Sequence, residues 1–185
     1  MKNSFYSPEE LRELGFRSVG EEVFISRKAS FYGIERIAIG SHVRIDDFCI
    51  LSAGSEIVIG NYVHIACYTS LIGEGRIVVS DYCNLSGRVS IYSSNDDYSG
   101  ASLTNPMVDR SLKNVVSEDV TLEPHVIVGC SSVILPGVTL GKGVAIGALS
   151  LVKSSCEPFT IWGGSPARRI GTRKRDMLAL IREDD

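Results

Sequence analysis

Long apolar runs, paired cysteine motifs and an excess of either charge are all missing from this 185-residue chain. Without a run of about 18 apolar residues, we expect no membrane insertion. The five cysteines form no Cys-x-x-Cys motif, and the first 15 residues are polar and acidic rather than a secretory leader. We therefore expect free thiols and a cytoplasmic protein. The formal net charge of -3 gives no reason to expect nucleic acid as a partner.

What the chain does contain is a six-residue period. From Leu122 onward an apolar residue recurs at every sixth position, and a slim residue follows each of them four places later. Less regular copies of the pattern begin at Ile39, Ile59 and Val79, twenty residues apart. The apolar set is Leu122, Val128, Ile134, Leu140 and Ile146, and the slim set is Val126, Ser132, Val138, Val144 and Ser150.

A period of six has a direct structural meaning. Each hexapeptide is a short strand with a turn, and three of them close one triangular coil whose apolar residues point inward. One coil cannot bury its own interior, so coils stack on one another. The pattern predicts an all-β fold, a left-handed parallel β-helix of hexapeptide repeats, over residues 22–155 of a single domain spanning 1–185. A sandwich or barrel would show alternation of apolar residues without the strict period of six.

The repeat is interrupted once, between about residues 94 and 120. Loops of this length without structure of their own are usually functional. We expect this long inserted loop to leave the prism and lie over a neighbouring subunit.

Both ends of the chain predict short α-helices. In the N-terminal segment, residues 1–20, Ser7 fits an N-cap, Pro8 the first turn and Glu10 a capping box. The C-terminal extension, residues 156–185, places apolar residues among charges over 172–183, which predicts an amphipathic helix packed on the protein.

Two stretches of the sequence resemble a known family. They are the run from Val128 to Val152 and the later segment Gly163-Gly164-Ser165-Pro166-Ala167-Arg168. Together they look like the hexapeptide-repeat acyltransferases, both the galactoside and maltose O-acetyltransferase type and the nucleotide-amino-sugar N-acyltransferase type. The resemblance covers about residues 25–172. It implies coenzyme A or acetyl-CoA as the acyl donor, a sugar or nucleotide-sugar acceptor, and a homotrimer with active sites between neighbouring prisms.

The same resemblance places the donor site on the last coils. Small turn residues there let the pantetheine arm lie against the backbone, and cations suit the phosphates at its nucleotide end. The residues implied in pantetheine binding are Gly129, Cys130, Ser131, Gly147 and Ala148, and those implied in nucleotide binding are Lys153 and Arg168.

At the acceptor end the family pattern changes. The O-acetyltransferases carry a histidine near the start of the inserted loop, where this sequence has Asn95 and Asp96. Several N-acyltransferases of the fold carry an Asn-Asp pair there. An amine attacks a thioester more readily than a hydroxyl does, so such a pair can hold the amine without a strong general base. Asp97 would add charge, and Tyr92 and Glu118 would assist from either side.

Alternatives to this amine reading remain open. A sugar hydroxyl would need a base from elsewhere, either His64, with Asn84 at the same repeat position one coil later, or an aspartate. A non-catalytic β-helix binding module is another alternative, because the loop histidine is missing. The zinc carbonic anhydrase of this fold needs two histidines five residues apart plus a third, whereas the three here stand at 42, 64 and 125, so we expect no metal. The amine reading is slightly favoured, and the family alone suggests surface-polysaccharide biosynthesis.

Overall fold

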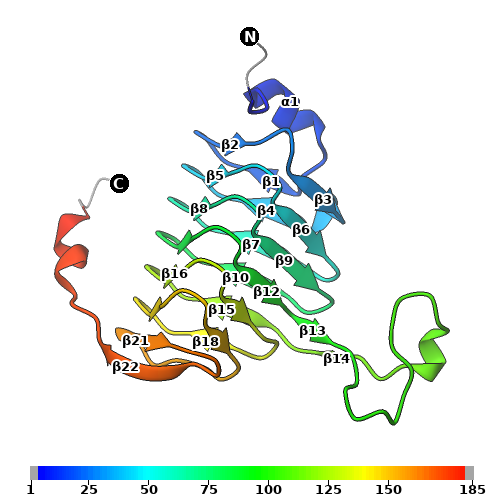
Figure 1. Cartoon of the computed structure of the whole chain (residues 1–185). Coiled ribbons are helices and arrows are strands. Elements are labelled where there is room, and N and C mark those ends of the chain that lie inside the picture. The colour runs from blue at the N-terminus through cyan, green and yellow to red at the C-terminus, as the bar shows by residue number, and fades with distance from the viewer. Residues whose placement is uncertain (1–3, 182–185) are drawn as a thin grey trace.

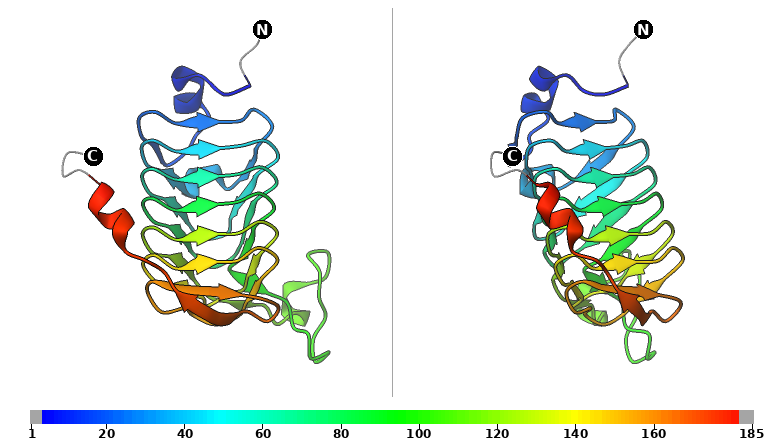
Figure 2. Two further views of the ribbon diagram at one scale, coloured as in Figure 1. Left: turned by 60° about the vertical axis from the view of Figure 1, so that its left-hand side comes forward. Right: turned by 90° about the vertical axis from the view of Figure 1, so that its left-hand side faces the viewer.

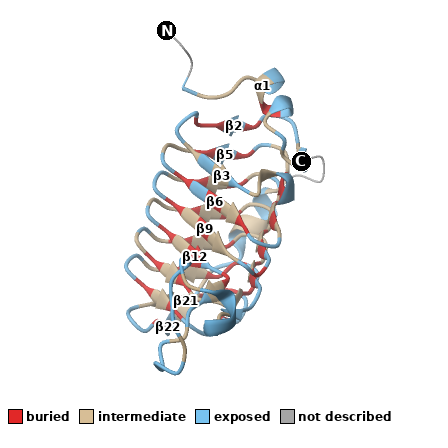
Figure 3. Cartoon of the chain, turned by 90° about the vertical axis from the view of Figure 1, so that its right-hand side faces the viewer, coloured by how far each residue is buried: buried red, intermediate tan, exposed pale blue. Residues whose placement is uncertain are grey.

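The inward positions of the six-residue period form one continuous core. In the computed structural model, which describes residues 4–181, every member of the predicted apolar set is at most 3% exposed and every member of the slim set at most 2%. Figure 3 shows that the buried residues are concentrated along the strands of the coils, while most turns between them are intermediate or exposed. The predicted parallel β-helix is confirmed (Figure 1).

Three sheets make the sides of the prism, and we call them the first, second and third faces. The first face is β1 (Ser18–Val19), β4 (Ile37–Ile39), β7 (Ile57–Ile59), β10 (Ile77–Val79), β15 (Val120–Leu122) and β18 (Thr139–Leu140). The second face is β2 (Phe24–Ile25), β5 (Arg44–Ile45), β8 (His64–Ile65), β11 (Asn84–Leu85), β16 (Ile127–Val128), β19 (Ala145–Ile146), β21 (Thr160–Gly163) and the antiparallel β22 (Arg168–Thr172). The third face is β3 (Ser30–Tyr32), β6 (Ile50–Ala53), β9 (Ser70–Gly73), β12 (Ser90–Tyr92), β17 (Val133–Ile134) and β20 (Leu151–Val152).

Successive coils lie in exact register, so equivalent residues form columns. On the second face Arg44 pairs with His64, and His64 pairs with Asn84. Neighbouring members of a column are about 4.8 Å apart, and side chains alternate between the core and the surface along each strand. A residue's place in the repeat therefore fixes both its face and its direction.

The corner between the first and second faces carries a stack of aromatic rings. His42, Tyr62, Tyr82 and His125 all have left-handed backbone, with φ of 58°, 56°, 58° and 66°. Their ring centroids follow one another at 4.6, 4.8 and 5.0 Å. Left-handed backbone costs about 1–2 kcal/mol per residue, and the aromatic pairs offset part of that cost. Two of the three histidines thus belong to the corner itself.

The N-terminal helix forms as predicted. Helix α1 (Pro8–Glu13) begins after Ser7, whose hydroxyl accepts a hydrogen bond from the Glu10 amide, while the Glu10 carboxylate accepts one from the Ser7 amide. Gly15, with φ of +91°, lies directly after the helix. Helix α1 sits on the first coil at one end of the prism (Figure 1).

The C-terminal prediction is wrong over the described residues. The chain forms β22 and then a short 3-10 helix, η3 (Asp176–Leu180), in place of an amphipathic α-helix, and Leu180 is 80% exposed. Figure 2 shows this segment running beside the prism. The Arg173 guanidinium donates to the carbonyl oxygens of His125 and Gly143, at 2.7 and 3.1 Å, which ties the chain to the coils just before η3. Residues 182 and 183 of the predicted helix lie outside the described part.

The inserted loop leaves the prism after β12. It starts and ends in a two-stranded antiparallel ribbon, β13 (Ser94–Asn95) with β14 (Val116–Ser117), and contains a short 3-10 helix, η2 (Arg110–Leu112). In Figure 1 the loop projects away from the coils. Between residues 4 and 181 there is no helix long and apolar enough to cross a bilayer.

Candidate active site

A cavity of about 710 Å³ lies between the inserted loop and the third face. Its lining includes apolar side chains from three coils, namely Ile72, Tyr92, Val133 and Leu135. The loop contributes polar groups, namely Asn95, Asp96 and Lys113, and Glu74 adds a carboxylate. The cavity therefore brings together three of the residues expected from the sequence, Tyr92, Asn95 and Asp96.

The ribbon at the base of the loop positions the Asn-Asp pair. Asn95 is the last residue of β13 and pairs with Val116, so its backbone is fixed. Asp96 is the first residue beyond the strand and is exposed. Within residues 4–181 its carboxylate has no hydrogen-bond or ion-pair partner. An anionic group without a partner, held at the rim of a cavity, suits a cationic or amine-bearing ligand.

Asp97 faces a different environment from its neighbour. One carboxylate oxygen accepts from the Ser99 amide at 2.8 Å and the other from the Ser102 hydroxyl at 2.7 Å. These hydrogen bonds lower the pKa of Asp97 to about 2. Its side chain ties the loop to itself and does not line the cavity. Glu118 does not line it either, because its backbone pairs with Ser93 and its carboxylate lies against Gly137.

His64 and Asn84 lie on the second face, away from the loop cavity. His64 Nε2 is 2.8 Å from an oxygen of Asp46, and its Nδ1 is 3.2 Å from the amide oxygen of Asn84. Asp46 also accepts from Arg44 Nε at 2.7 Å. Partial burial raises the pKa of Asp46, but hydrogen bonds from His64 and Arg44 outweigh it and the net shift is downward. Both ring nitrogens of His64 thus lie within hydrogen-bonding distance of a protein oxygen, while the side chain stays 42% exposed.

The residues implied in pantetheine binding occupy the corner between the second and third faces, which we call the donor corner. Gly129, Cys130 and Ser131 lie on one coil, and Gly147 and Ala148 lie on the next. Cys130 and Ala148 are exposed. A side chain at Gly129 would come within 2.5 Å of the Ala148 nitrogen, so close stacking of the coils already requires glycine there.

Lys153 and Arg168 lie near the C-terminal end of the prism. Lys153 directly follows β20, and Arg168 begins β22. Both side chains are exposed, and neither has a carboxylate within 4.0 Å among the described residues. Two cations without ion-pair partners below the donor corner are compatible with a phosphate-bearing ligand.

Sequence reasoning missed Arg44 and Asp46. The available signal was the coil length, because Arg44 stands exactly one twenty-residue coil before His64.

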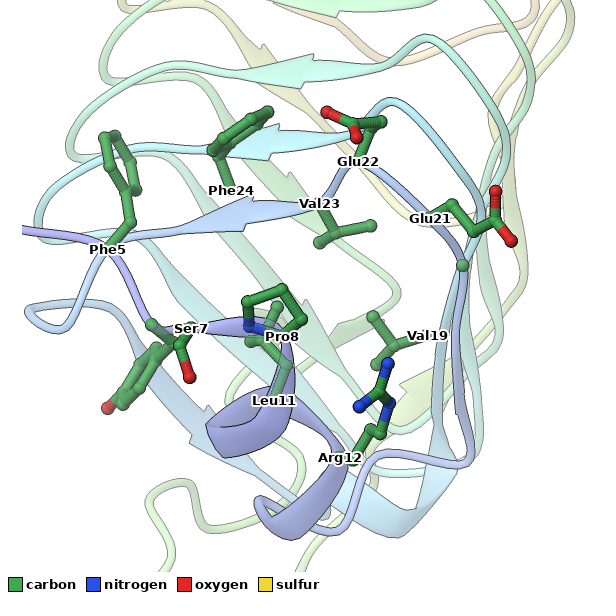
Figure 4. A pocket seen from close by; sticks show the side chains of 12 residues that line it. Phe5, Ser7, Pro8, Leu11, Arg12, Val19, Glu21, Glu22, Val23 and Phe24 are labelled. Atoms are coloured by element: carbon green, nitrogen blue, oxygen red, sulfur yellow. The ribbon is translucent and has the colours of Figure 1, made fainter.

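A further cavity of about 600 Å³, under helix α1, contains none of the expected site residues. In Figure 4 its side chains include Leu11, Val19 and Val23, which close the top of the prism. The described residues contain no group of three or more histidines, cysteines or carboxylates arranged to hold a metal.

Known proteins resemble this chain over nearly its whole length. It is 54% identical over 172 residues to the dTDP-4-amino-4,6-dideoxy-D-glucose acyltransferase of Escherichia coli, covering 92% of this chain and 90% of that protein. The N-acyltransferase AntD of Bacillus cereus, in complex with dTDP and 3-hydroxybutyryl-CoA, matches with a TM-score of 0.93 at 49% identity, covering 96% of this chain and 94% of AntD. A mutant of AntD in complex with dTDP-4-amino-4,6-dideoxyglucose and coenzyme A matches with a TM-score of 0.93 at 48% identity, covering 97% of this chain and 96% of the mutant. No family model matches the chain.

Proposed function

The chain belongs to the coenzyme A-dependent hexapeptide-repeat acyltransferases, and we propose that its acceptor is the amine of a dTDP-linked 4-amino-4,6-dideoxy sugar. The observation that carries this proposal is the Asn95-Asp96 pair at the rim of the loop cavity, with an Asp96 carboxylate that lacks a partner among the described residues. A carboxylate attracts an ammonium, and an amide can orient the amine once it is neutral.

The reaction needs little more than this placement. After the ammonium loses a proton to solvent, the amine nitrogen attacks the thioester carbonyl carbon. A carbon–nitrogen bond forms, the carbon–sulfur bond breaks, and the departing thiolate takes the second proton of the amine. The products are an amide and coenzyme A with a free thiol. Orientation of the two reactants supplies most of the rate enhancement.

The hydroxyl alternative would need His64 or an aspartate as its base. His64 lies on the second face and does not line the loop cavity, and a carboxylate is a weak base toward a hydroxyl. The binding-module alternative rested on the missing loop histidine. The chain is, however, 54% identical to an acyltransferase named for an amino-sugar nucleotide, which favours catalysis. The amine reading explains the missing histidine without loss of activity.

We further propose that the enzyme works as a homotrimer. One prism separates the expected groups, because the loop cavity is on the third face while His64 and Asn84 are on the second. These faces meet at the donor corner, where Phe48 and Tyr68 stack at 5.0 Å and are 45% and 50% exposed. Packing the second face of one subunit against the third face of the next would cover these rings and complete the site.

The donor corner and the cations below it suit coenzyme A. The pantetheine arm would follow Gly129 to Ser131 and Gly147 to Ala148, with Lys153 and Arg168 toward its phosphates. We propose a short acyl group, acetyl or slightly longer, cytoplasmic location and a role in surface-polysaccharide biosynthesis.

A thiol-release assay tests the proposed function. Purified enzyme with acetyl-CoA or 3-hydroxybutyryl-CoA is given dTDP-4-amino-4,6-dideoxyglucose or its 4-hydroxyl counterpart. We expect thiol release only with the amine. Turnover confined to the hydroxyl compound would overturn the proposal.

A further inference from the structure

The outward column of the second face changes character along the prism. From the N-terminal coil downward it presents Phe24, Arg44, His64 and Asn84, and then the apolar Ile127, Ala145 and Ile161. The corresponding columns of the other faces hold no charged residue over the described coils. They are Ser18, Ala38, Val58, Val78, Thr121 and Thr139 on the first face, and Ser30, Ile50, Ser70, Ser90, Val133 and Leu151 on the third. A charged residue in the outward column, Arg44, is thus particular to the second face.

These polar side chains are fixed by one another and remain accessible. Asp46 holds Arg44 on one side and His64 on the other, at 2.7 and 2.8 Å, and Asn84 extends the line by a contact of 3.2 Å. The Arg44 and His64 side chains are nevertheless 58% and 42% exposed. Only Nε of Arg44 contacts Asp46, and its terminal nitrogens make no hydrogen bond to any described residue. Side chains locked in place yet exposed are preorganised for a ligand.

Aromatic rings lie at the upper end of this line. Phe24 is 48% exposed and meets Phe5 edge to face, with ring centroids 6.0 Å apart. The Arg44 guanidinium lies 5.3 Å from the centre of the Phe5 ring. A cavity of about 380 Å³ beside them is lined by Phe5, Arg44, Asp46 and Cys67, among others. In the left-hand view of Figure 2, which looks onto the second face, no ribbon from elsewhere in residues 4–181 crosses these strands.

We propose that this column is the acceptor's binding track, an inference that rests on the proposed function. The nucleobase lies against Phe24 and Phe5, and the diphosphate binds the free terminal nitrogens of Arg44. The pyranose then hydrogen-bonds to His64 and Asn84. The four successive strands that carry Phe24, Arg44, His64 and Asn84 span about 14 Å, a length that suits an extended nucleotide sugar. The amine of such a ligand would lie at the level of the loop and the donor corner. His64 is a binding group in this arrangement, with the Asp46 carboxylate as its positioning residue.

Calorimetric titration of the intact enzyme with dTDP tests the diphosphate contact. Arg44→Gln removes the charge, and Arg17→Gln removes another carboxylate-paired arginine, 46% exposed and directly before β1 of the first face. We expect R44Q to weaken dTDP binding about 10- to 100-fold, the loss of one charge-assisted contact, and R17Q to leave it unchanged. Thermal unfolding of each variant checks the fold. If folded R44Q binds dTDP as tightly as the wild type, the track is wrong.

Kinetics test the role of His64. Glutamine retains hydrogen-bonding groups without titrating, so we expect His64→Gln to raise the KM for the amino-sugar nucleotide about 5- to 10-fold while kcat and its pH profile stay unchanged. A collapse of kcat with loss of its acid limb would make His64 a general base and overturn the inference. If the wild type turns over no amino-sugar nucleotide, the proposed function itself fails. If the wild type turns over the amino-sugar nucleotide normally and R44Q binds dTDP as tightly as the wild type, only the binding-track inference fails and the proposed function stands.

Discussion

Two adjacent aspartates in the inserted loop allow one chemical change to be tested in two environments. Asp96 has no partner among the described residues, so Asp96→Asn should leave the fold intact and act only on the ligand. A hydrogen bond to a charged group contributes about 1.5–3 kcal/mol, which corresponds to a loss of about 10- to 150-fold in kcat/KM. The decrease should appear in kcat/KM for the acceptor rather than for acyl-CoA, because the proposed partner of Asp96 is the acceptor's ammonium.

Asp97→Asn is the matched control. Both oxygens of Asp97 already accept hydrogen bonds from Ser99 and Ser102, so this change loosens the loop without removing a ligand contact. We expect a smaller loss, at most about 10-fold, because asparagine keeps one acceptor oxygen for the loop and no ligand contact is removed. The assay is thiol release from acyl-CoA at varied acceptor and fixed donor. A D96N enzyme as active as the wild type, or a D97N enzyme more impaired than D96N, would refute the assignment.

Further predictions concern stability and assembly. Leu85→Ala empties a fully buried position and should lower the free energy of unfolding in urea by about 2–5 kcal/mol, whereas Leu180→Ala, 80% exposed, should change it by less than about 0.5; equal effects would contradict the core assignment. Arg173→Ala should free the C-terminal tail, seen as faster amide exchange there with the coils protected; unchanged exchange would contradict the clamp. Because folding lowers the pKa of Asp46, its carboxylate stabilises the fold at pH values above the unfolded-state pKa of about 3.8, and this contribution disappears as the pH falls through the folded-state pKa. Asp46→Asn should therefore weaken the pH dependence of the free energy of unfolding in that acid range. An unchanged pH dependence would contradict this assignment. Sedimentation should give three times the chain mass, and a monomer would contradict the trimer.

The fold was predictable because a six-residue period fixes the direction of every side chain. An inward residue such as Val128 or Ile146 must fill the prism, so its type is constrained at each repeat. The tail was not predictable in the same way. Its apolar spacing is that of a helix, but the helix forms only if a partner surface exists. Pairing of β22 with β21 and the clamp by Arg173 are contacts that local pattern does not encode.

The candidate site was predictable to the level of the motif. The Asn95-Asp96 pair was expected near the loop, and it lines the loop cavity. The sequence could not separate Asp96 from Asp97, because their difference lies in hydrogen bonds from residues of the same loop. It also gave no role to Asp46, although the coil length places Arg44 directly beside His64. Tertiary register, rather than residue type, decided these assignments.

The most direct test of the account is the identity of the product. The enzyme is incubated with acyl-CoA and dTDP-4-amino-4,6-dideoxyglucose, and the nucleotide sugar is recovered for mass spectrometry and NMR. The account predicts one added acyl group in amide linkage at the sugar nitrogen, with one free thiol released per product. An acyl group in ester linkage to a hydroxyl, with the amine left free, would contradict it.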